Sequence, residues 1–495
     1  MITARPVYTT NPYEELTIGI VAAYGASSNP VIANERDIVS LNKLVYESLV
    51  ELDDSLKPAP LLADRWVRDN DTYTFYLRGV PFHNGARLTA YDVKASYDSI
   101  LQVGDSNPYY AYVNSYIAEM SVQDEFTLTV RAKHWGYMFL YAMTFPVIQR
   151  DSIYTAQPWG TGPYWYINNS PDAGLRLERN PHWWKVAPAV QALNTVRYDS
   201  PEAAMRGFET GALDMVATRS GIASLSGQLS DRHAMDYTTQ VYEMIIPNTG
   251  KSLLADAEIR RALMYAIDRD AVANTAYQGM VKKSEVPVMP GCWLYETQSA
   301  TYNYNPEYAL KILNDAGWYD EERRGTLRRV KDNMIQEFAL SLITYQEPTS
   351  SRRLDAAKLI AEQLGRIGVR VEVSTMKKNI IREALRNGEF DLALVAENLS
   401  MIPDLSFMLA EDGAHNFSKY KNPMMDNELT AARDALTQEA LIASMSKIQL
   451  LIIKDLPIMG LFYRSGKLVS RHRLTGLTGI REDQVLRGFE FVGSQ

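Results

Sequence analysis

The sequence predicts an α/β protein of two lobes, the first of which carries a strand-rich insertion. The chain has 495 residues, roughly three times the length of a typical domain of about 150 residues, so it can form several cores. In the first half, a two-residue hydrophobic period changes to a helical one, and the second half alternates helices with strands. Such alternation implies parallel strands that are joined by crossover helices.

The first half begins with a short apolar run over residues 17–22, which predicts a buried strand followed by a loop. Apolar residues at helical spacing predict a helix over 38–49. Further along, the pattern predicts strands over 126–130 and 175–178 and a short helix over 203–211. The strand over 126–130 belongs to a long alternating, turn-rich region that continues to about residue 150, and this region indicates the strand-rich insertion.

The change of period lies in residues 73–101, which read YTFYLRGVPFHNGARLTAYDVKASYDSIL. Alternate residues from Tyr73 to Leu77 share one face, which indicates a half-buried strand. Asn84-Gly85 tolerates positive φ and predicts a turn, and Thr89 to Asp92 resembles a capping box at the start of a helix. We therefore interpret this segment as scaffold rather than as part of a site.

The second half shows longer helical patterns separated by short apolar runs. Asn305-Pro306 and Gly317 have the residue types that open and close a helix. The pattern predicts helices over 257–274, 306–316, 354–367 and 380–386, and strands over 369–373 and 390–395.

Charge and cysteine content exclude several classes of protein. A formal net charge of −8 argues against a nucleic-acid partner, because phosphate binding requires clustered Lys and Arg. Cys292 is the only cysteine, so one chain can build neither a disulfide framework nor a thiolate zinc site. No run reaches the ~18 apolar residues of a membrane span, and the N-terminus lacks a secretory signal, which predicts a cytoplasmic protein or a trimmed mature form.

Two glycine-containing segments resemble nucleotide-binding loops but fail on spacing. Thr249–Ser252 reads TGKS, yet the phosphate cradle needs a glycine five residues before Gly250, and that position is Ile245. Gly160–Gly162 fails as a dinucleotide loop because Trp165 stands at the third glycine position. We expect a turn there instead.

No motif of a known catalytic or metal site is present. The 6 histidines are scattered without metal-ligand spacing. We therefore predict no cofactor, no metal site and no catalytic residue. The 59 acidic residues would still allow a pair of cleft carboxylates, so a hydrolase stays open as a weaker alternative.

Five sets of motifs occur in a fixed order along the chain. They are LLADRWVRDNDTYTFYLRGVPFHNGARLTAYDVKASYDSI, GTGPYWY with LERNPHWW, EIRRALMYAIDRDAV, YNPEYALKILNDAGW and NFSKYKNPMMDNEL. Together they resemble the extracellular solute-binding protein family 5, which includes the oligopeptide, dipeptide and nickel receptors of bacterial ABC importers. The resemblance covers nearly the whole chain from about residue 15.

The resemblance implies a two-lobed, periplasmic-binding-protein-like fold of type II, with an extra α+β subdomain in lobe one. Lobe one would comprise residues 1–242 and 468–495, with the subdomain at about 42–155, and lobe two would comprise 243–467. The implied function is the capture of a peptide or peptide-like solute between the lobes and its delivery to the transmembrane subunits of a permease. A receptor for nickel, a metal chelate or another non-peptide solute is the alternative.

The resemblance also implies an extracytoplasmic location, in the periplasm or at the outer face of the cell membrane, frequently as a lipoprotein. A removed leader would explain the N-terminus, and peripheral membrane association would then come from a lipid anchor. We expect a monomer that binds no nucleic acid.

One family position suggests an unusual solute. Members of the family usually carry Trp-x-x-Asp ahead of a proline, and the Asp pairs with the free amine of the peptide. Counted back from Pro403, this sequence has Ala396 and Leu399 at those places, so Glu397 or Asn398 would have to substitute.

A second position departs in the same way. The dipeptide receptors place an arginine shortly before the helix that begins here near Leu354, where it holds a carboxylate, but this sequence has Tyr345-Gln346-Glu347. A charged terminus buried by closure needs a partner, because unpaired burial costs several kcal/mol. The solute is therefore expected to lack free termini in those places.

The remaining positions implied by the resemblance lie after the first strand and beside the first crossing between the lobes. The complete predicted ligand-binding set is Asn34, Glu35, Arg36, Tyr242, Met244, Tyr345, Glu347, Glu397 and Asn398.

Overall fold

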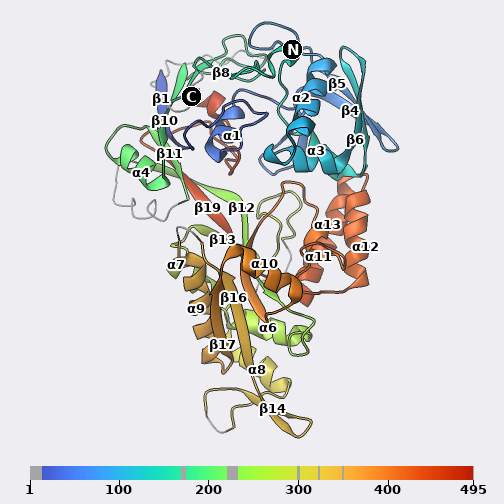
Figure 1. Cartoon of the computed structure of the whole chain (residues 1–495), viewed down its shortest axis with the longest axis vertical. Coiled ribbons are helices and arrows are strands. Elements are labelled where there is room, and N and C mark those ends of the chain that lie inside the picture. Colours follow the sequence, from blue (N-terminus) through green and yellow to red (C-terminus); the bar gives the residue numbers. More distant parts are fainter. Residues whose placement is uncertain are drawn as a thin grey trace. The chain divides into compact units, whose positions relative to one another are not determined.

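The computed structural model describes residues 14–168, 174–219, 232–297, 302–321, 324–347 and 350–493. The chain forms two compact units (Figure 1): unit 1 comprises Met1–Thr238 and Gly466–Gln495, and unit 2 comprises Thr239–Ser465. The two crossings lie within β12 (His233–Pro247) and β19 (Met459–Ser470). Each unit is described by itself below.

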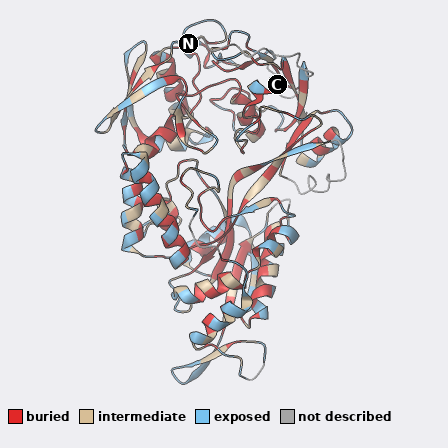
Figure 2. Ribbon diagram, turned by 180° about the vertical axis from the view of Figure 1, so that it is seen from behind, coloured by how far each residue is buried: buried red, intermediate tan, exposed pale blue. Residues whose placement is uncertain are grey.

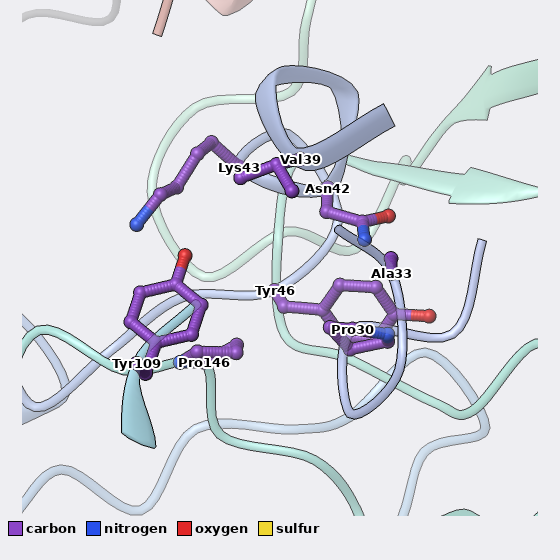
Figure 3. Close-up of a pocket in the computed structure, with 8 residues that line it drawn as sticks. All are labelled: Pro30, Ala33, Val39, Asn42, Lys43, Tyr46, Tyr109 and Pro146. Atoms are coloured by element: carbon purple, nitrogen blue, oxygen red, sulfur yellow. The ribbon is translucent and has the colours of Figure 1, made fainter. Parts of the chain in front are cut away.

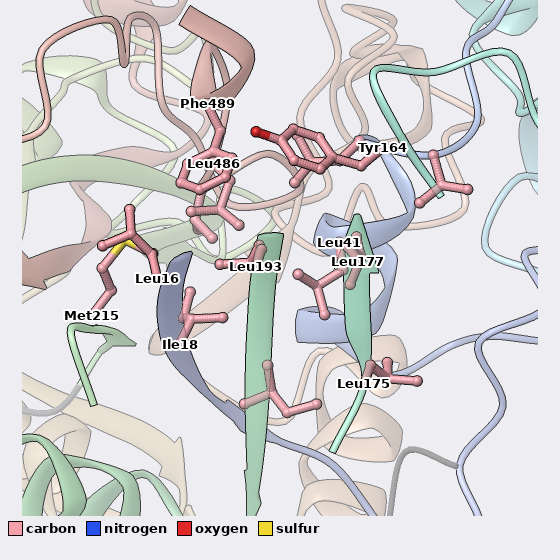
Figure 4. Packing of buried hydrophobic residues seen from close by; sticks show 14 of the residues in the cluster. Leu16, Ile18, Leu41, Tyr164, Leu175, Leu177, Leu193, Met215, Leu486 and Phe489 are labelled. Atoms are coloured by element: carbon pink, nitrogen blue, oxygen red, sulfur yellow. The ribbon is translucent and has the colours of Figure 1, made fainter. Parts of the chain in front are cut away.

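A mixed sheet forms the centre of unit 1. Its strands run in the order β11 (Met215–Thr218), β1 (Glu15–Val21), β10 (Ala192–Tyr198), β9 (Arg176–Arg179) and β8 (Tyr164–Tyr166). Strand β1 is parallel to both of its neighbours, whereas β9 and β8 are antiparallel, and the end of β19 pairs antiparallel with β11. Buried residues of these strands, of α1 (Arg36–Asn42) and of the C-terminal segment form one core (Figure 4).

A second sheet in unit 1 occupies the strand-rich insertion. It is antiparallel, in the order β4 (Ala63–Asp69), β5 (Thr72–Leu77), β7 (Thr127–Ala132) and β6 (Ile117–Asp124). Phe75 of β5 is fully buried, as the two-residue period predicts. The other elements of the insertion are β2 (Val50–Leu52), β3 (Pro58–Pro60), α2 (Ala90–Val103), η1 (Gly104–Ser106), α3 (Tyr110–Tyr116), η2 (Tyr137–Met143) and η3 (Arg150–Ser152).

The start of α2 confirms the predicted cap. The Asp92 carboxylate accepts hydrogen bonds from the Thr89 N–H at 2.9 Å and from the Thr89 hydroxyl at 2.6 Å. Asp92 also accepts from the Arg150 N–H at 3.0 Å, which ties the helix to the segment after η2. A residue that closes both a helix end and a distant loop has a structural role, in agreement with the scaffold interpretation.

The Gly160–Gly162 segment is a close backbone crossing, and no phosphate loop is formed. Gly162 N donates to Val45 O at 3.0 Å, and a Cβ on Gly162 would lie 2.5 Å from Leu44 O. Only glycine allows this approach, which explains the composition of the segment.

Glu47 is a buried carboxyl group beside this crossing. Its Oε2 accepts hydrogen bonds from Thr161 Oγ1 and Trp184 Nε1, both at 2.8 Å. Burial raises the pKa of Glu47 to about 7, against the opposing effects of Lys185, whose Nζ lies 3.9 Å away, and of the two hydrogen bonds. The folded protein therefore holds a proton here at pH values where the unfolded chain, with a carboxyl pKa near 4.5, has lost it.

We expect the difference in unfolding free energy between Glu47→Gln and the wild-type protein to change with pH. As the pH rises from about 4 to about 8, it should shift by about 3 kcal/mol in favour of the variant. The raised pKa stabilises the folded wild type below the unfolded pKa, and this contribution is lost as the pH rises through about 7. Urea unfolding of both proteins across this range measures the difference, and Glu119→Gln, at an exposed ion pair with Arg131, is the control. A difference that stays constant with pH would contradict the raised pKa.

The sheet of unit 2 contains the order β17 (Arg370–Met376), β16 (Ala339–Tyr345), β18 (Leu392–Asn398) and β12. Strands β16, β17 and β18 are parallel, which confirms the crossover pattern, and β12 is antiparallel to β18. The short strand β13 (Val281–Lys283) pairs antiparallel with β19. Helix α9 (Arg352–Arg366) packs against β16 and β17.

The remaining helices of unit 2 surround this sheet. Helix α6 (Ala257–Ala266) packs against α8 (Pro306–Asp315), and α12 (Pro423–Asp434) packs against α13 (Gln438–Asp455). The other elements of unit 2 are α7 (Arg269–Thr275), α10 (Lys378–Asn387), α11 (Ser406–Leu409) and the hairpin of β14 (Arg328–Lys331) and β15 (Met334–Glu337). Two further elements belong to unit 1: α4 (Pro201–Glu209) and η6 (Phe489–Phe491). The central strands are buried, whereas the helices expose one face (Figure 2).

Two predicted helices differ from the structure. The helix predicted over 257–274 is wrong as a single element, because the backbone leaves the helical region at Ile267 and Asp268 caps the separate helix α7 by accepting from Ala271 N. The helix predicted over 38–49 ends at Asn42, after which the chain turns. Helix periodicity alone does not register such breaks, because the apolar spacing continues across them.

None of the helices in the described part of the chain combines the length and the apolar character that a membrane crossing requires.

Candidate ligand-binding site

The predicted residues of unit 2 gather at one edge of its sheet. Strands β16 and β18 are parallel, so their carboxyl ends, at Tyr345 and Asn398, lie at the same edge. The antiparallel β12 begins its pairing with β18 there, with Tyr242 opposite Glu397. Proteins with open α/β sheets bind their ligands outside the carboxyl ends of the strands. This edge is therefore the first candidate for the ligand-binding site.

Four charged side chains form a compact group at this edge, which we call the arginine–glutamate cluster: Glu243, Glu347, Arg353 and Arg464. Arg353 binds Glu243 through two nitrogens, with Nε to Oε2 at 3.0 Å and Nη2 to Oε1 at 2.9 Å. Arg464 bridges the two carboxylates, with Nε to Glu243 Oε1 at 2.6 Å and Nη2 to Glu347 Oε1 at 2.7 Å. The formal charge of the cluster is zero.

The two ion pairs of the cluster differ in exposure. The side chains of Glu243 and Arg353 are 0% and 2% exposed, whereas those of Glu347 and Arg464 are 15% and 21% exposed. Burial by itself raises the pKa of Glu243, but Arg353 and Arg464 outweigh it and hold that pKa below its usual value. Glu243 is therefore a buried anion that depends on both arginines, and the Glu347–Arg464 pair is the more exposed part of the cluster.

Two tyrosines flank the cluster. The guanidinium carbon of Arg353 lies 4.1 Å from the ring centroid of Tyr345, and that of Arg464 lies 5.8 Å from the ring of Tyr277. Cation–π contacts of this kind hold the planar guanidinium groups in place. The structure thus brings the predicted residues Tyr345 and Glu347 together. The residues that connect them are arginines, which were not among the predicted site residues.

Three buried atoms of this group have no hydrogen-bond partner among the described residues: Arg353 Nη1, Glu347 Oε2 and Tyr277 Oη. The first donates, the second accepts, and the hydroxyl can do either. Buried polar atoms are rarely left unpaired, because each costs about 1–3 kcal/mol. These atoms are themselves buried, and each lacks a hydrogen-bond partner that the described residues do not supply.

The second predicted pair, Glu397 and Asn398, lies at the end of β18. Asn398 is exposed, whereas Glu397 is half-buried with its Oε1 3.2 Å from His415 Nδ1. The imidazole stacks on Phe417 at 5.3 Å between centroids and meets Phe407 edge-on at 5.5 Å. A carboxylate beside aromatic rings is suited to a ligand that carries a polar group on an apolar body.

In unit 1, the predicted residues lie at the carboxyl edge of the parallel strands β1, β10 and β11. Asp37 accepts from Val21 N at 2.8 Å and from Arg36 Nε at 2.8 Å, and Glu35 accepts from Ala23 N at 3.4 Å. Asn34 is exposed. Glu35 and Arg36 are therefore held by the start of α1 against the end of β1.

Arg219, which directly follows β11, and Tyr237 in the first half of β12 join this group. Burial and then the nearby charge of Arg36 lower the pKa of Arg219 to about 10, and Arg219 forms an ion pair with Glu482. Burial raises the pKa of Tyr237, although Arg219 and Arg36 act against it. Arg36 and Arg219 therefore lie close enough to interact, and each is paired with an acidic residue, Asp37 and Glu482 respectively.

Tyr242 and Met244 are buried inside unit 2. Tyr242 Oη donates to Ser284 O at 3.2 Å, and its ring lies 4.9 Å from that of Tyr463. Neither side chain is exposed in the structure, with 0% and 2% of their surface accessible. The structure places both in the core behind the edge, and their contact with a solute stays a prediction.

Two of the hollows that the described residues form lie away from the predicted residues. A cavity of about 10 Å³ in unit 1 is large enough for one water molecule and too small for a solute; it is lined by Pro30, Ala33, Val39, Asn42, Lys43, Tyr46, Tyr109 and Pro146 (Figure 3). An open hollow of about 700 Å³ lies between α11 and α12 of unit 2. Its lining contains none of the predicted residues.

Within the described ranges, no three His, Cys, Asp or Glu side chains come together in a group that could hold a metal ion.

Sequence reasoning missed Glu243, Arg353, Arg464 and His415. One signal for Arg353 was available: it stands in the first turn of α9, where the helix dipole disfavours a positive charge. A buried cation at that position requires an acidic partner elsewhere in the fold. The partner is Glu243, 110 positions away, which no local pattern identifies.

The chain matches two characterised proteins over most of its length. It is 26% identical over 489 residues to Protein XP55 of Streptomyces lividans, covering 95% of this chain and 87% of the relative. It is 21% identical over 473 residues to the oligopeptide-binding protein AppA of Bacillus subtilis, covering 90% and 86%.

Structural similarity agrees with these matches. The crystal structure of the nickel ABC transporter from Bacillus halodurans superposes with a TM-score of 0.83 at 19% identity, covering 96% of this chain and 99% of that one. The fold is therefore that of the type II periplasmic binding proteins, as the resemblance implied.

A family model decides the assignment. Residues 57–418 match the model described as "Bacterial extracellular solute-binding proteins, family 5 Middle". Members of this family act outside the cytoplasm and capture solutes for ABC importers. The chain belongs to the bacterial extracellular solute-binding proteins, family 5.

Proposed function

We propose that this protein captures a peptide or peptide-like solute and presents it to a permease, without catalysing a reaction. The observation that supports this proposal most directly concerns the edge of unit 2. There, the charge-balanced cluster and the neighbouring Tyr277 contain buried donors and acceptors that have no partner among the described residues. Backbone amides need hydrogen-bond donors and acceptors in close succession and carry no charge, so this chemistry suits them. AppA, one of the relatives, is an oligopeptide-binding protein.

Capture would involve both units. The predicted residues of each unit lie at the carboxyl edge of its parallel strands, and both crossings of the chain run through strands of these sheets. We propose that the units act as the two lobes of a receptor that closes on the solute by a hinge motion. Monomeric state and attachment through a lipid anchor are parts of the same proposal.

Mass spectrometry of the solute that co-purifies with the protein tests the proposal directly. After mild denaturation, we expect masses and fragment spectra of one or a few short peptides or amide-containing compounds. Recovery of no solute, together with no binding to a peptide library in calorimetry, would count against a peptide receptor.

A metal chelate is the second candidate solute. His415 presents an imidazole next to the Glu397 carboxylate, and imidazole and carboxylate groups are common metal ligands. The structurally similar protein of Bacillus halodurans is a nickel ABC transporter. Elemental analysis of the purified protein distinguishes the two, because a peptide solute predicts no stoichiometric metal.

A hydrolase would turn over what it binds. We expect incubation with a peptide library to leave every peptide intact. Cleavage that disappears on substitution of Glu35 or Glu397 would replace the receptor with an enzyme.

We expect Arg36→Ala to weaken solute affinity roughly tenfold, because a hydrogen bond to a charged group is worth about 1.5–3 kcal/mol. Stability should change little, since the Arg36–Asp37 pair is partly exposed. Calorimetry with the co-purified solute measures the affinity, and Arg65→Ala, at an exposed position of β4, is the control. Unchanged affinity would remove Arg36 from the binding site.

A further inference from the structure

The arginine–glutamate cluster contains the groups that would bind a carboxylate, yet all of its positive charge is already neutralised. Arg353 and Arg464 carry two positive charges, and Glu243 and Glu347 carry two negative ones. Arginine forks are well suited to a carboxylate. A solute carboxylate that approached this cluster would meet an arginine, Arg464, whose charge is already neutralised by Glu347 beside it.

Glu347 decides this balance at the more exposed side of the cluster. Glu243 is fully buried and contacts four arginine nitrogens through its two oxygens, so its removal would leave a buried cation without its partner. Glu347 is different, because it uses only Oε1, at 2.7 Å from Arg464 Nη2 and 3.4 Å from Arg353 Nη2, while its Oε2 has no partner among the described residues.

The unpaired atoms favour a neutral hydrogen-bonding group. Arg353 Nη1 requires an acceptor and Glu347 Oε2 requires a donor, whereas Tyr277 Oη can donate or accept a hydrogen bond. An amide has a carbonyl oxygen and an N–H group, which are the two kinds of partner that these atoms lack. A carboxylate offers acceptors only, and it would leave Glu347 Oε2 unpaired and close to a second negative charge.

We propose that Glu347 is a specificity-determining residue that closes this cluster to carboxylates and selects solutes that place an amide there. The inference rests on the proposed function as a solute receptor. It assigns the solute class at this edge: a peptide whose chain continues past the cluster, or whose carboxyl end is blocked.

Glu347→Gln tests the proposal as a gain of binding. The substitution leaves an oxygen that can still accept from Arg464, but it changes the charge of the cluster from zero to +1. The probes are pairs of short alanine peptides that are identical except for a free carboxylate or an amide at the C-terminus. We expect calorimetry to show that the variant binds the free acids roughly tenfold more tightly than the wild type does, with little change for the amides.

Two further variants serve as controls for this interpretation. Glu347→Ala removes the same charge with a different side chain and should gain affinity for the acids in the same direction. Glu362→Gln removes one negative charge from the exposed Glu362–Arg366 pair on α9 and should leave the preference unchanged. The gain should also shrink at high salt, because it is electrostatic.

The outcomes separate the inference from the function on which it rests. If the folded variants show no gain for the free acids over the wild type, including no binding of any probe, the role of Glu347 is refuted. Tight binding of the free acids by the wild type would refute it as well. If the wild type carries no solute and binds no peptide while the variants bind the acids, the role of Glu347 stands and the peptide-receptor proposal fails.

Discussion

Arg353→Met is expected to lower the free energy of unfolding of unit 2 by about 3–5 kcal/mol. Arg353 is 2% exposed and supplies two of the four arginine nitrogens that contact Glu243, which is fully buried. Removing the arginine leaves the carboxylate with Arg464 alone. An uncompensated buried charge is costly, because its lost hydration is no longer offset by a nearby opposite charge.

The same change also raises the pKa of Glu243, since burial raises it and Arg353 is the first of the two arginines that lower it. The variant should therefore lose less stability at low pH, where the carboxyl group is protonated in both states, than at neutral pH. Urea unfolding followed by circular dichroism measures the loss, and hydrogen–deuterium exchange of β12 and α9 assigns it to unit 2.

Arg366→Met is the matched control for this experiment. Arg366 lies on the same helix and pairs with Glu362 at 2.8 Å, but both side chains are more than half exposed. Exposed pairs of this spacing contribute about 0.3–0.5 kcal/mol. Equal losses from the two substitutions would show that the cluster does not stabilise unit 2 as a buried network.

Phe75→Ala is expected to lower stability by about 3 kcal/mol without a change in solute affinity per folded molecule. Phe75 is fully buried in β5, opposite Trp66 of β4 and Leu128 of β7, and its ring lies 6.5 Å from that of Phe139. Truncation removes apolar surface and leaves a cavity that the surrounding rings cannot fill.

Thermal and urea unfolding measure the effect of Phe75→Ala, and calorimetry with the co-purified solute measures the affinity. Thr74→Ala, on the opposite face of the same strand, serves as the control and should change stability by less than about 0.5 kcal/mol. Normal stability with lost binding would mean that Phe75 belongs to the site and that the scaffold interpretation is wrong.

Local elements were predictable where their cause lies within a few residues. The start of α2 follows from Thr89 and Asp92, which are three positions apart, and the two-residue period of β5 reflects one buried face. The break between α6 and α7 was missed, because the apolar spacing continues across it while Asp268 caps a new helix. Periodicity reports which face is buried and does not report every interruption.

The candidate site was only half predictable. The parallel pairing of β16 with β18 places Tyr345 and Asn398 at one edge, which the alternation of helices and strands implied. The charge of that edge was not predictable, because Arg464 comes from a strand 221 positions after Glu243. The sequence analysis inferred a missing arginine near the start of α9, whereas the fold supplies two and neutralises both.

The sequence by itself determined many of the elements, the absence of a disulfide framework and the resemblance to a family of solute receptors, because these depend on periodicity, composition and ordered local motifs. The tertiary structure alone decided which charges meet. Coulomb energies and desolvation depend on distances between side chains and on burial, and in this cluster both are set by strands and a helix that lie far apart in the sequence.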